Sequence, residues 1–364
     1  MTVKSALSNW TAYTPVLAIV ALLLSYGRVL PPAAVVVISL FLAAAVLAAV
    51  HHAEVVAHKV GEPYGSLILA VAVTVIEVAL IVTLMISGGE SSQSLARDTV
   101  FAAVMITCNG ILGISLLVGA LRRRIAVFNP EGTGAAFATV TAIATLSLVL
   151  PAFTTSSPGP QFTPAQLGFA AVVSLGLYLL FVGVQTRRHR YYFLPITTSG
   201  EVIDAEEHLD APSRRTALTS LGLLLVALIA VVGLAKGVSP AVESGVQNAG
   251  LPQSVVGVVI ALLVLLPETI AAVRAASRDR MQTSINLALG SAMASIGLTI
   301  PAIAAAMIWL PGPLLLGLGG TQMVLLGLTV VIGTLTVVPG RANILQGGLH
   351  LSLLAVFLFL AASP

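Results

Sequence analysis

A chain of 364 residues that is 57% hydrophobic and only 9% charged differs sharply from soluble domains, which carry about 25% charged residues. This composition excludes a soluble globular protein and favours helices that face lipid or one another. The net charge of +3 comes from basic residues in short loops, so we attribute it to membrane orientation and expect no nucleic-acid partner.

Apolar runs of about 20 residues mark membrane spans. In chain order they predict eleven spans, at 12–27, 32–50, 65–87, 99–121, 134–154, 165–185, 216–236, 252–273, 282–309, 313–338 and 343–361. We therefore expect an all-α polytopic membrane protein.

The distribution of lysine and arginine predicts how these spans are oriented. With the N-terminus in the cytoplasm, fourteen of the 17 basic residues lie on the cytoplasmic side, and Arg28, Arg97 and Lys236 lie outside. Membrane proteins keep most basic residues in cytoplasmic loops, so this division supports the orientation and the number of spans. We expect a multi-pass protein of a bacterial inner membrane, with the central loop inside and the C-terminus outside.

The longest polar segment, 186–215, divides the chain. An extra N-terminal helix (1–31) and five spans (32–185) precede this cytoplasmic loop, and five spans (216–364) follow it. An odd number of spans in each half makes the second half begin on the opposite side of the membrane. This is the arrangement of an inverted repeat, which many secondary transporters use.

Glu77 and Glu268 lie well inside predicted spans, each seven residues after an alanine and four after a valine. A charged side chain at the bilayer centre costs about 2.5–3.5 kcal/mol on insertion scales. Such a carboxyl group stays protonated or meets a cation, because desolvation favours the neutral form and a positive charge favours the ionised form. This chemistry suits a proton/cation exchanger. The alternative is a pair of buried carboxyl groups that hydrogen-bond to neighbouring helices.

Other oxygen atoms near these glutamates are candidate supporting ligands. Pro267 has no N–H, so the carbonyl of Leu263 loses its helical partner. Free carbonyl oxygens beside a carboxylate suit a hard cation such as Ca²⁺. The candidate side chains are Thr74, Asn109, Asn286, Ser291 and Ser295.

The stretch from Gly61-Glu62-Pro63-Tyr64-Gly65 to Glu77, and that from Glu268 to Gly290-Ser291, resemble the calcium/cation antiporter superfamily. The chain is most similar to its cation/proton exchanger branch, the bacterial calcium/proton and sodium(potassium)/proton antiporter type. The resemblance covers nearly the whole chain. It implies that Glu77 and Glu268 bind the transported cation and exchange it for protons.

The sequence departs from this family at the Gly-Asn pair that precedes each glutamate. Val73-Thr74 and Val264-Leu265 occupy these positions, so both asparagine oxygens are missing and Na⁺ or K⁺ remains open as cargo. The resemblance also implies a proton-route role for Glu54. Lys236 lies near the place of its counterpart and is a candidate second cation, or a lysine that extends to the interface at a helix end.

His51, Glu54 and His58 share one face of a helix, because they are spaced at i, i+3 and i+7. The enzyme alternative is a membrane-embedded zinc hydrolase that uses these three residues as ligands. The histidines are otherwise candidates for a proton route, since histidine titrates near neutrality. The acidic run in the central loop, Glu201, Asp204, Glu206, Glu207 and Asp210, is either a cation sensor or a solvated linker.

These observations together predict a transporter and no enzyme. We expect it to export cytoplasmic Ca²⁺ or Na⁺, with K⁺ as a further candidate, in exchange for protons by alternating access. The expected partners are cations, protons and the lipid bilayer, with no cofactor and with a homo-oligomer left open. A small-molecule efflux carrier and a cation channel are the transport alternatives.

Overall fold

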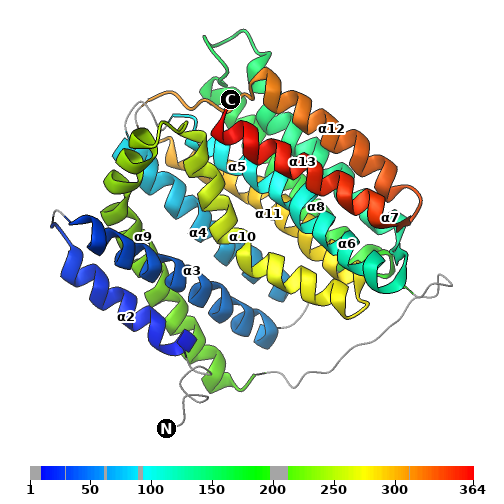
Figure 1. Cartoon of the computed structure of the whole chain (residues 1–364), viewed down its shortest axis with the longest axis horizontal. Helices are drawn as coiled ribbons and strands as arrows, with labels where there is room; N and C mark the ends of the chain where they lie inside the picture. Colours follow the sequence, from blue (N-terminus) through cyan, green and yellow to red (C-terminus); the bar gives the residue numbers. More distant parts are fainter. Residues whose placement is uncertain (1–9, 29, 61–63, 89–92, 197–211, 311) are drawn as a thin grey trace. The chain divides into compact units, whose positions relative to one another are not determined.

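The computed structural model describes residues 10–28, 30–60, 64–88, 93–196, 212–310 and 312–364, which are mostly helical (Figure 1). Among these residues, nine helices are long and apolar enough to cross a membrane. Two further apolar helices complete the eleven that the sequence predicts. They are Trp10–Ser25 and the helix Tyr64–Gly88, which contains the apolar segment Val71–Ile86. The predicted all-α membrane fold is therefore confirmed. The acidic run at 201–210 and the Gly61-Glu62-Pro63 segment lie outside the described residues.

The chain forms two compact units, each assembled from both halves of the sequence. The first unit comprises Met1–Ser92 and His208–Val256, with the helices α2 (Trp10–Ser25), α3 (Pro32–Val60), α4 (Tyr64–Gly88) and α9 (Arg214–Asn248). α3 packs along α9, and both α2 and α4 contact this pair. The first helices of the two predicted five-helix repeats therefore pack together.

The second unit comprises Gln93–Glu207 and Gly257–Pro364 and contains the remaining elements. Its helices are α5 (Leu95–Met105), α6 (Leu112–Arg123), α7 (Pro130–Ala144), α8 (Pro164–Gly183), α10 (Ser254–Ser277, from Gly257 onward), α11 (Met281–Ala306), α12 (Gly320–Val337) and α13 (Ile344–Ala362). Its strands are β1 (Ala126–Val127) and β2 (Arg341–Ala342).

α11 is central to the second unit, because it packs against α5, α6, α7 and α8. The span that contains α5 and α6 is continuous from Leu95 to Arg123 and is the most buried of the candidate spans. A π-helical turn, Ile106–Ile111, interrupts its α-helical geometry near the middle. Such turns often occur at functional sites and place extra side chains on one face of a helix.

Several helices of this unit begin at clear local sequence signals. The Asn129 side chain accepts hydrogen bonds from the backbone of Glu131 and Gly132, and Pro130 opens α7. Thr163 and Gln166 cap α8 reciprocally. These side chains satisfy N–H groups that have no partner inside the helix.

Three predicted span boundaries are wrong. α3 continues to Val60 and α9 continues to Asn248, beyond the apolar runs that end at 50 and 236. α12 begins at Gly320, although its apolar run begins at 313. The segment before α12 is extended, and its backbone bonds elsewhere: Gly317 N–H donates to Pro160 O at 2.9 Å and Leu318 N–H to Leu148 O at 2.8 Å.

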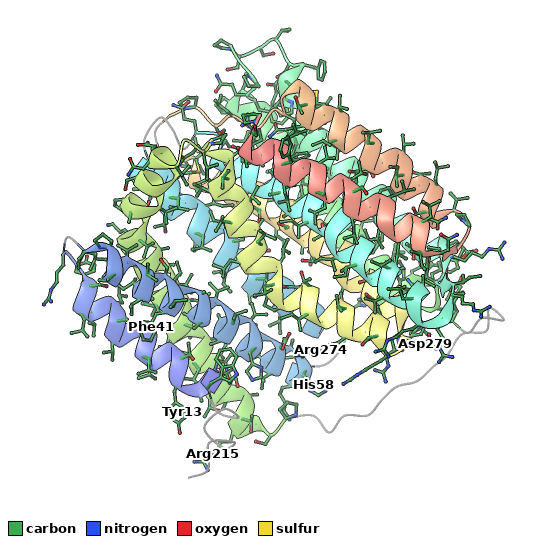
Figure 2. The ribbon with its side chains drawn as sticks, viewed as in Figure 1. Tyr13, Phe41, His58, Arg215, Arg274 and Asp279 are labelled. Carbon is green, nitrogen blue, oxygen red and sulfur yellow. The ribbon has the colours of Figure 1, made fainter. Side chains whose placement is uncertain are left out.

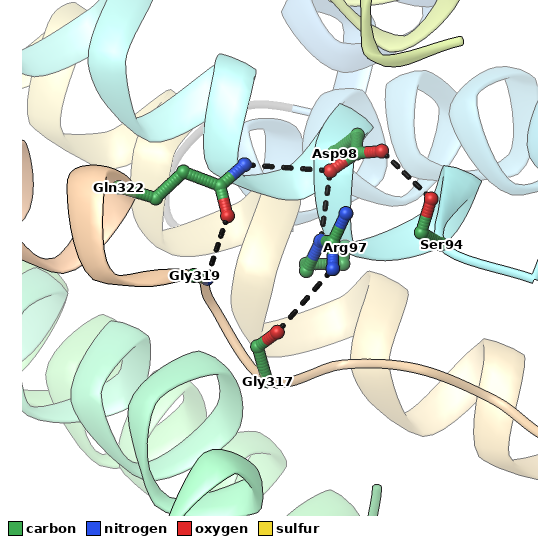
Figure 3. Close-up of polar contacts among 6 residues, drawn as sticks. All are labelled: Ser94, Arg97, Asp98, Gly317, Gly319 and Gln322. Carbon is green, nitrogen blue, oxygen red and sulfur yellow. Dashed lines mark hydrogen bonds and ion pairs between the residues drawn. The ribbon is translucent and has the colours of Figure 1, made fainter. Parts of the chain in front are cut away.

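A partly buried ion pair also fixes this segment (Figure 3). Arg97 Nε lies 2.8 Å from Asp98 Oδ1, and the Arg97 guanidinium donates to the carbonyl of Gly317 at 3.4 Å. Asp98 also accepts from Ser94 Oγ at 2.9 Å and from Gln322 Nε2 at 3.5 Å. Because the Asp98 side chain is only 3% exposed, these donors are what allows its carboxylate to be buried.

The crossing of α6 and α13 depends on glycine. A Cβ atom on Gly347 would lie 2.8 Å from the backbone nitrogen of Leu117 and 3.0 Å from the carbonyl oxygen of Gly113. Nothing lies within 4 Å of a Cβ atom placed on the next residue, Gly348. We predict that Gly347→Ala lowers the unfolding free energy by about 1–3 kcal/mol, as overpacking does.

The matched control is Gly348→Ala, which should be neutral or slightly stabilising because alanine favours helix over glycine by about 1 kcal/mol. Thermal unfolding midpoints of the purified variants in detergent measure the difference. Equal midpoints for the two variants would contradict the close packing of α6 on α13.

Candidate functional site

Glu77 lies in the middle of α4, in the first unit, and is only 3% exposed. Thr74, one turn earlier, is 6% exposed, and Leu80 and Ile81, one turn later, are also buried. Residues three and four positions apart share a face of a helix, so Glu77 belongs to the buried face of α4. Thr74 is the polar neighbour that this face offers it.

Glu268 is half-buried on α10, in the second unit, directly after Pro267. The helix continues through the proline to Ser277, although Pro267 has no N–H to donate to the carbonyl of Leu263. One turn after Leu265, the Thr269 hydroxyl donates to the Leu265 carbonyl at 2.7 Å. The chain therefore places a carboxyl group beside a helical turn in which one backbone carbonyl lacks its usual donor.

The two glutamates belong to different compact units. The structure describes each glutamate within its own unit. That the two glutamates form one ion-binding site therefore stays a prediction. Both units supply a carboxyl group from the interior of an apolar helix, as the sequence indicates. The described residues contain no group of three His, Cys, Asp or Glu side chains that could hold a metal ion.

Asn109, a predicted supporting ligand, is fully buried in the π-helical turn between α5 and α6. Its side chain contacts Thr329 of α12 and His350 of α13. His350 in turn contacts Thr336, which also lies on α12. This group of four side chains, here called the buried amide cluster, joins three segments of the second unit.

The hydrogen-bond directions in the buried amide cluster follow from one hydroxyl. Thr329 Oγ1 donates to the carbonyl of Leu325 at 2.8 Å, so it accepts from Asn109 Nδ2 at 2.9 Å. Asn109 Oδ1 then accepts a hydrogen bond from His350 Nδ1 at 3.1 Å. Nε2 of the neutral ring accepts from Thr336 Oγ1 at 3.2 Å. The carboxamide of Asn109 is thus committed to helix–helix contacts.

Asn286, another predicted ligand, is also engaged elsewhere. Its Nδ2 donates to the carbonyl of Phe193 at 2.7 Å, and its Oδ1 accepts from Gln282 Nε2 at 2.9 Å. The Gln282 carbonyl in turn accepts from the backbone N–H of Asn129 at 2.7 Å. These bonds tie α11 to the start of α7 and to the turn that follows α8. Ser291 is half-buried and Ser295 is 5% exposed on the same helix, α11.

The proposed zinc ligands His51, Glu54 and His58 are all exposed on α3. His58, which Figure 2 labels, lies near the end of this helix. These three residues are not among any group of described side chains that could hold a metal ion, so the structure does not support the zinc-hydrolase alternative. Their part in a proton route stays a prediction. Lys236 is exposed inside α9 and not at its end, because this helix continues to Asn248.

Sequence reasoning missed the polar contacts of three histidine and threonine positions. His52 Nε2 donates to the carbonyl of Thr11 at 2.9 Å and links α3 to α2. Sequence reasoning does not single out His350 or Thr336 as functional residues, because neither forms a motif on its own. A usable signal existed in α12, where Thr329 and Thr336 are seven residues apart and so share a helix face.

Comparison with known proteins places this geometry in context. Residues 30–187 and 219–362 match the family described as sodium/calcium exchanger protein. The chain is 46% identical over 362 residues to the putative ionic transporter y4hA of Sinorhizobium fredii (strain NBRC 101917 / NGR234), covering 98% of this chain and 96% of that protein. It is 32% identical over 361 residues to the sodium-potassium/proton antiporter ChaA of Escherichia coli (strain K12), covering 98% and 97%.

The structural comparison agrees with these matches. Native YfkE superposes with a TM-score of 0.71 at 17% sequence identity, covering 98% of this chain and 99% of that chain. At this identity the likeness concerns the fold.

The buried amide cluster generates a stability prediction. Thr336→Val keeps the shape of the side chain but leaves Nε2 of His350 without its donor, so it should lower the unfolding free energy by about 1–3 kcal/mol. Thr334→Val is the control, because the exposed Thr334 hydroxyl donates only to Val330 of its own helix. Thermal unfolding in detergent compares the two. Equal destabilisation would show that the hydrogen bond from Thr336 to His350 contributes no more stability than the local helix bond of Thr334.

Proposed function

The chain belongs to the sodium/calcium exchanger protein family, and we propose that it exports a cytoplasmic cation in exchange for protons by alternating access. The family and the bacterial antiporter among the relatives support a cation antiporter with ions as its substrates, and the location that we propose is a bacterial inner membrane. The observation that carries the proposal is the placement of Glu77 and Glu268 inside apolar helices, which the sequence predicts to be matching positions of two repeats.

Competition between protons and a cation would couple the two fluxes. A carboxyl group in a poorly hydrated helix interior is stable when it carries a proton or when a cation neutralises it. In the proposed cycle, protons from outside bind Glu77 and Glu268 and release the cation. The binding site of the protonated protein then closes to the outside and opens to the cytoplasm. The protons leave to the cytoplasm, and a cytoplasmic cation binds the two carboxylates.

The choice of candidate cations rests on the charge of the two glutamates and on the oxygen atoms available near them. Two carboxylates neutralise one Ca²⁺, and the carbonyl of Leu263 and the hydroxyls of Thr74, Ser291 and Ser295 are candidate further ligands. The absence of the Gly-Asn pairs favours a site that also accepts Na⁺ or K⁺. The name of the Escherichia coli relative, a sodium-potassium/proton antiporter, agrees with this broader cargo.

The proposed orientation keeps both the N-terminus and the central loop in the cytoplasm. It rests on the excess of basic residues in the loops assigned to the cytoplasm. A channel and a small-molecule carrier remain the alternatives within transport. A channel would carry cations without moving protons in the opposite direction, so proton coupling separates it from the exchanger.

The exchange proposal predicts that Glu77→Gln and Glu268→Gln each abolish cation-dependent dissipation of a pH gradient in everted membrane vesicles. Glutamine keeps the size of the side chain but can neither release a proton nor neutralise a cation. Ca²⁺, Na⁺ and K⁺ are added separately, and the pH gradient is followed with a fluorescent dye. Glu131→Gln, which changes an exposed carboxyl group at the start of α7, should retain transport. Normal exchange in either span variant would remove that glutamate from the site.

Competition also predicts a specific pH dependence. The cation concentration that half-saturates exchange should rise as the pH falls, by up to about tenfold per pH unit for each proton displaced, because metal ligands must be deprotonated. The maximal rate at saturating cation should change much less. Initial rates at a series of cation concentrations and pH values test this. A half-saturating concentration that does not vary with pH would show that protons and cations use separate sites.

A further inference from the structure

Two short strands close one end of the second unit. β1 (Ala126–Val127) follows α6, and β2 (Arg341–Ala342) precedes α13. They pair antiparallel, with Ala126 opposite Ala342 and Val127 opposite Arg341. This β1–β2 bridge lies where two apolar helices reach the end of their spans, which is the level at which lipid headgroups meet a membrane protein.

The bridge has a buried face and an exposed face. Directly opposed residues of an antiparallel pair lie on the same face. Ala126 and Ala342 are 3% and 2% exposed, so they define the inner face. Arg341 is exposed opposite Val127, so this second pair defines the outer face.

Four arginines lie in the bridge or shortly before it in the sequence, and the side chains of two of them have protein partners. Arg122 donates to the carbonyl of Ser277 at 2.8 Å, and Arg123 lies 2.9 Å from the carboxylate of Asp279. Asp279 is exposed at this end of the unit (Figure 2). These contacts hold the end of α6 against the turn after α10.

The other two arginines, Arg124 and Arg341, are exposed, and their guanidinium groups form no hydrogen bond or ion pair with any described residue. Arg124 also has a positive φ of 67°, a conformation that favours glycine after the end of a helix. Only one other described non-glycine residue, Asp279, shares this feature, and its carboxylate has a partner in Arg123. Arginine at a position that would suit glycine indicates a use for its guanidinium group.

Large apolar side chains close to these arginines in the sequence are exposed. Leu121 and Ile125 flank the arginines that precede β1, and they are 64% and 45% exposed. Ile344 and Leu345 follow β2 and are 48% and 65% exposed. A ligand that satisfies the whole surface must combine a negative headgroup with hydrocarbon, which a free anion does not.

The basic residues of this unit are all arginines, since the three lysines of the chain are Lys4, Lys59 and Lys236. Either lysine or arginine would serve for membrane orientation. Only arginine offers a planar fork that binds two oxygens of one phosphate. The choice of arginine therefore favours recognition of phosphate over a general positive charge.

We propose that the β1–β2 bridge binds an anionic phospholipid, with Arg124 and Arg341 on the phosphate and Leu121, Ile125, Ile344 and Leu345 against the acyl chains. The bound lipid would supply the counter-charge that the protein does not give these arginines. The proposal concerns lipid binding alone and does not depend on the exchange mechanism.

Native mass spectrometry of the full chain in detergent tests the proposal, with phosphatidylglycerol and phosphatidylcholine as probes. Arg124→Gln with Arg341→Gln should weaken phosphatidylglycerol binding by about fivefold for each arginine removed. The control pair, Arg188→Gln with Arg274→Gln, removes the same charge from two exposed arginines outside the bridge and should change binding less than twofold. Phosphatidylcholine should bind all variants weakly. Equal losses in the two pairs, or no loss in the bridge pair, would overturn the proposal.

Two further arms separate the contributions of shape and hydrocarbon. Arg341→Lys keeps the charge and loses the fork, so it should weaken phosphatidylglycerol binding severalfold, and it serves where the double variant does not fold. Leu345→Ser should also weaken binding, while inorganic phosphate at millimolar concentration should not displace the lipid. Full binding by the lysine variant, or displacement by inorganic phosphate, would contradict an arginine site for phospholipid.

Discussion

A carboxylate is poorly solvated between apolar helices, and the proposed chemistry of this protein depends on that constraint. Glu77 is almost completely buried on α4, and Glu268 is half-buried on α10 beside Pro267. In the proposed cycle, a glutamate in such surroundings binds either a proton or a cation, and one ligand excludes the other. An antiporter needs this exclusivity, because a site that held both ligands at once would not couple their fluxes.

The second unit shows how the protein treats polar groups that do not serve exchange. Asn109 and His350 saturate one another together with two threonines of α12, so an amide and an imidazole are buried without an unpaired donor in this cluster. Asp98 is buried with Arg97, Ser94 and Gln322 around it. These satisfied groups brace the helices around the π-helical turn and the start of α12.

Hydropathy predicted the eleven helices, because a span needs about 20 apolar residues and little else. It misplaced the ends of α3 and α9, where the helix continues through polar residues such as His51 and Lys236. It also placed the start of α12 too early, although Gly317, Gly319 and the neighbouring prolines mark an extended segment. Residues that are apolar enough for a membrane need not be helical when other segments satisfy their backbone.

The candidate site was predictable in part. The glutamates were visible because a carboxyl group inside an apolar run has few structural explanations. Asn109 and Asn286 are equally suitable as ligands in the sequence. Asn109 meets His350, however, and Asn286 meets the carbonyl of Phe193, and only the folded chain brings these distant partners to them. A single polar residue in a span therefore predicts a contact, and the partner decides whether that contact is structural or functional.

The most direct test of the exchange site is the release of protons when a cation binds. Purified protein in weakly buffered detergent solution is titrated with Ca²⁺, Na⁺ or K⁺ while a pH indicator or calorimetry in several buffers counts the protons released. Exchange at Glu77 and Glu268 predicts proton release that saturates with cation binding and is lost in the double glutamine variant. Cation binding without proton release in the unaltered protein would contradict competition for these carboxylates.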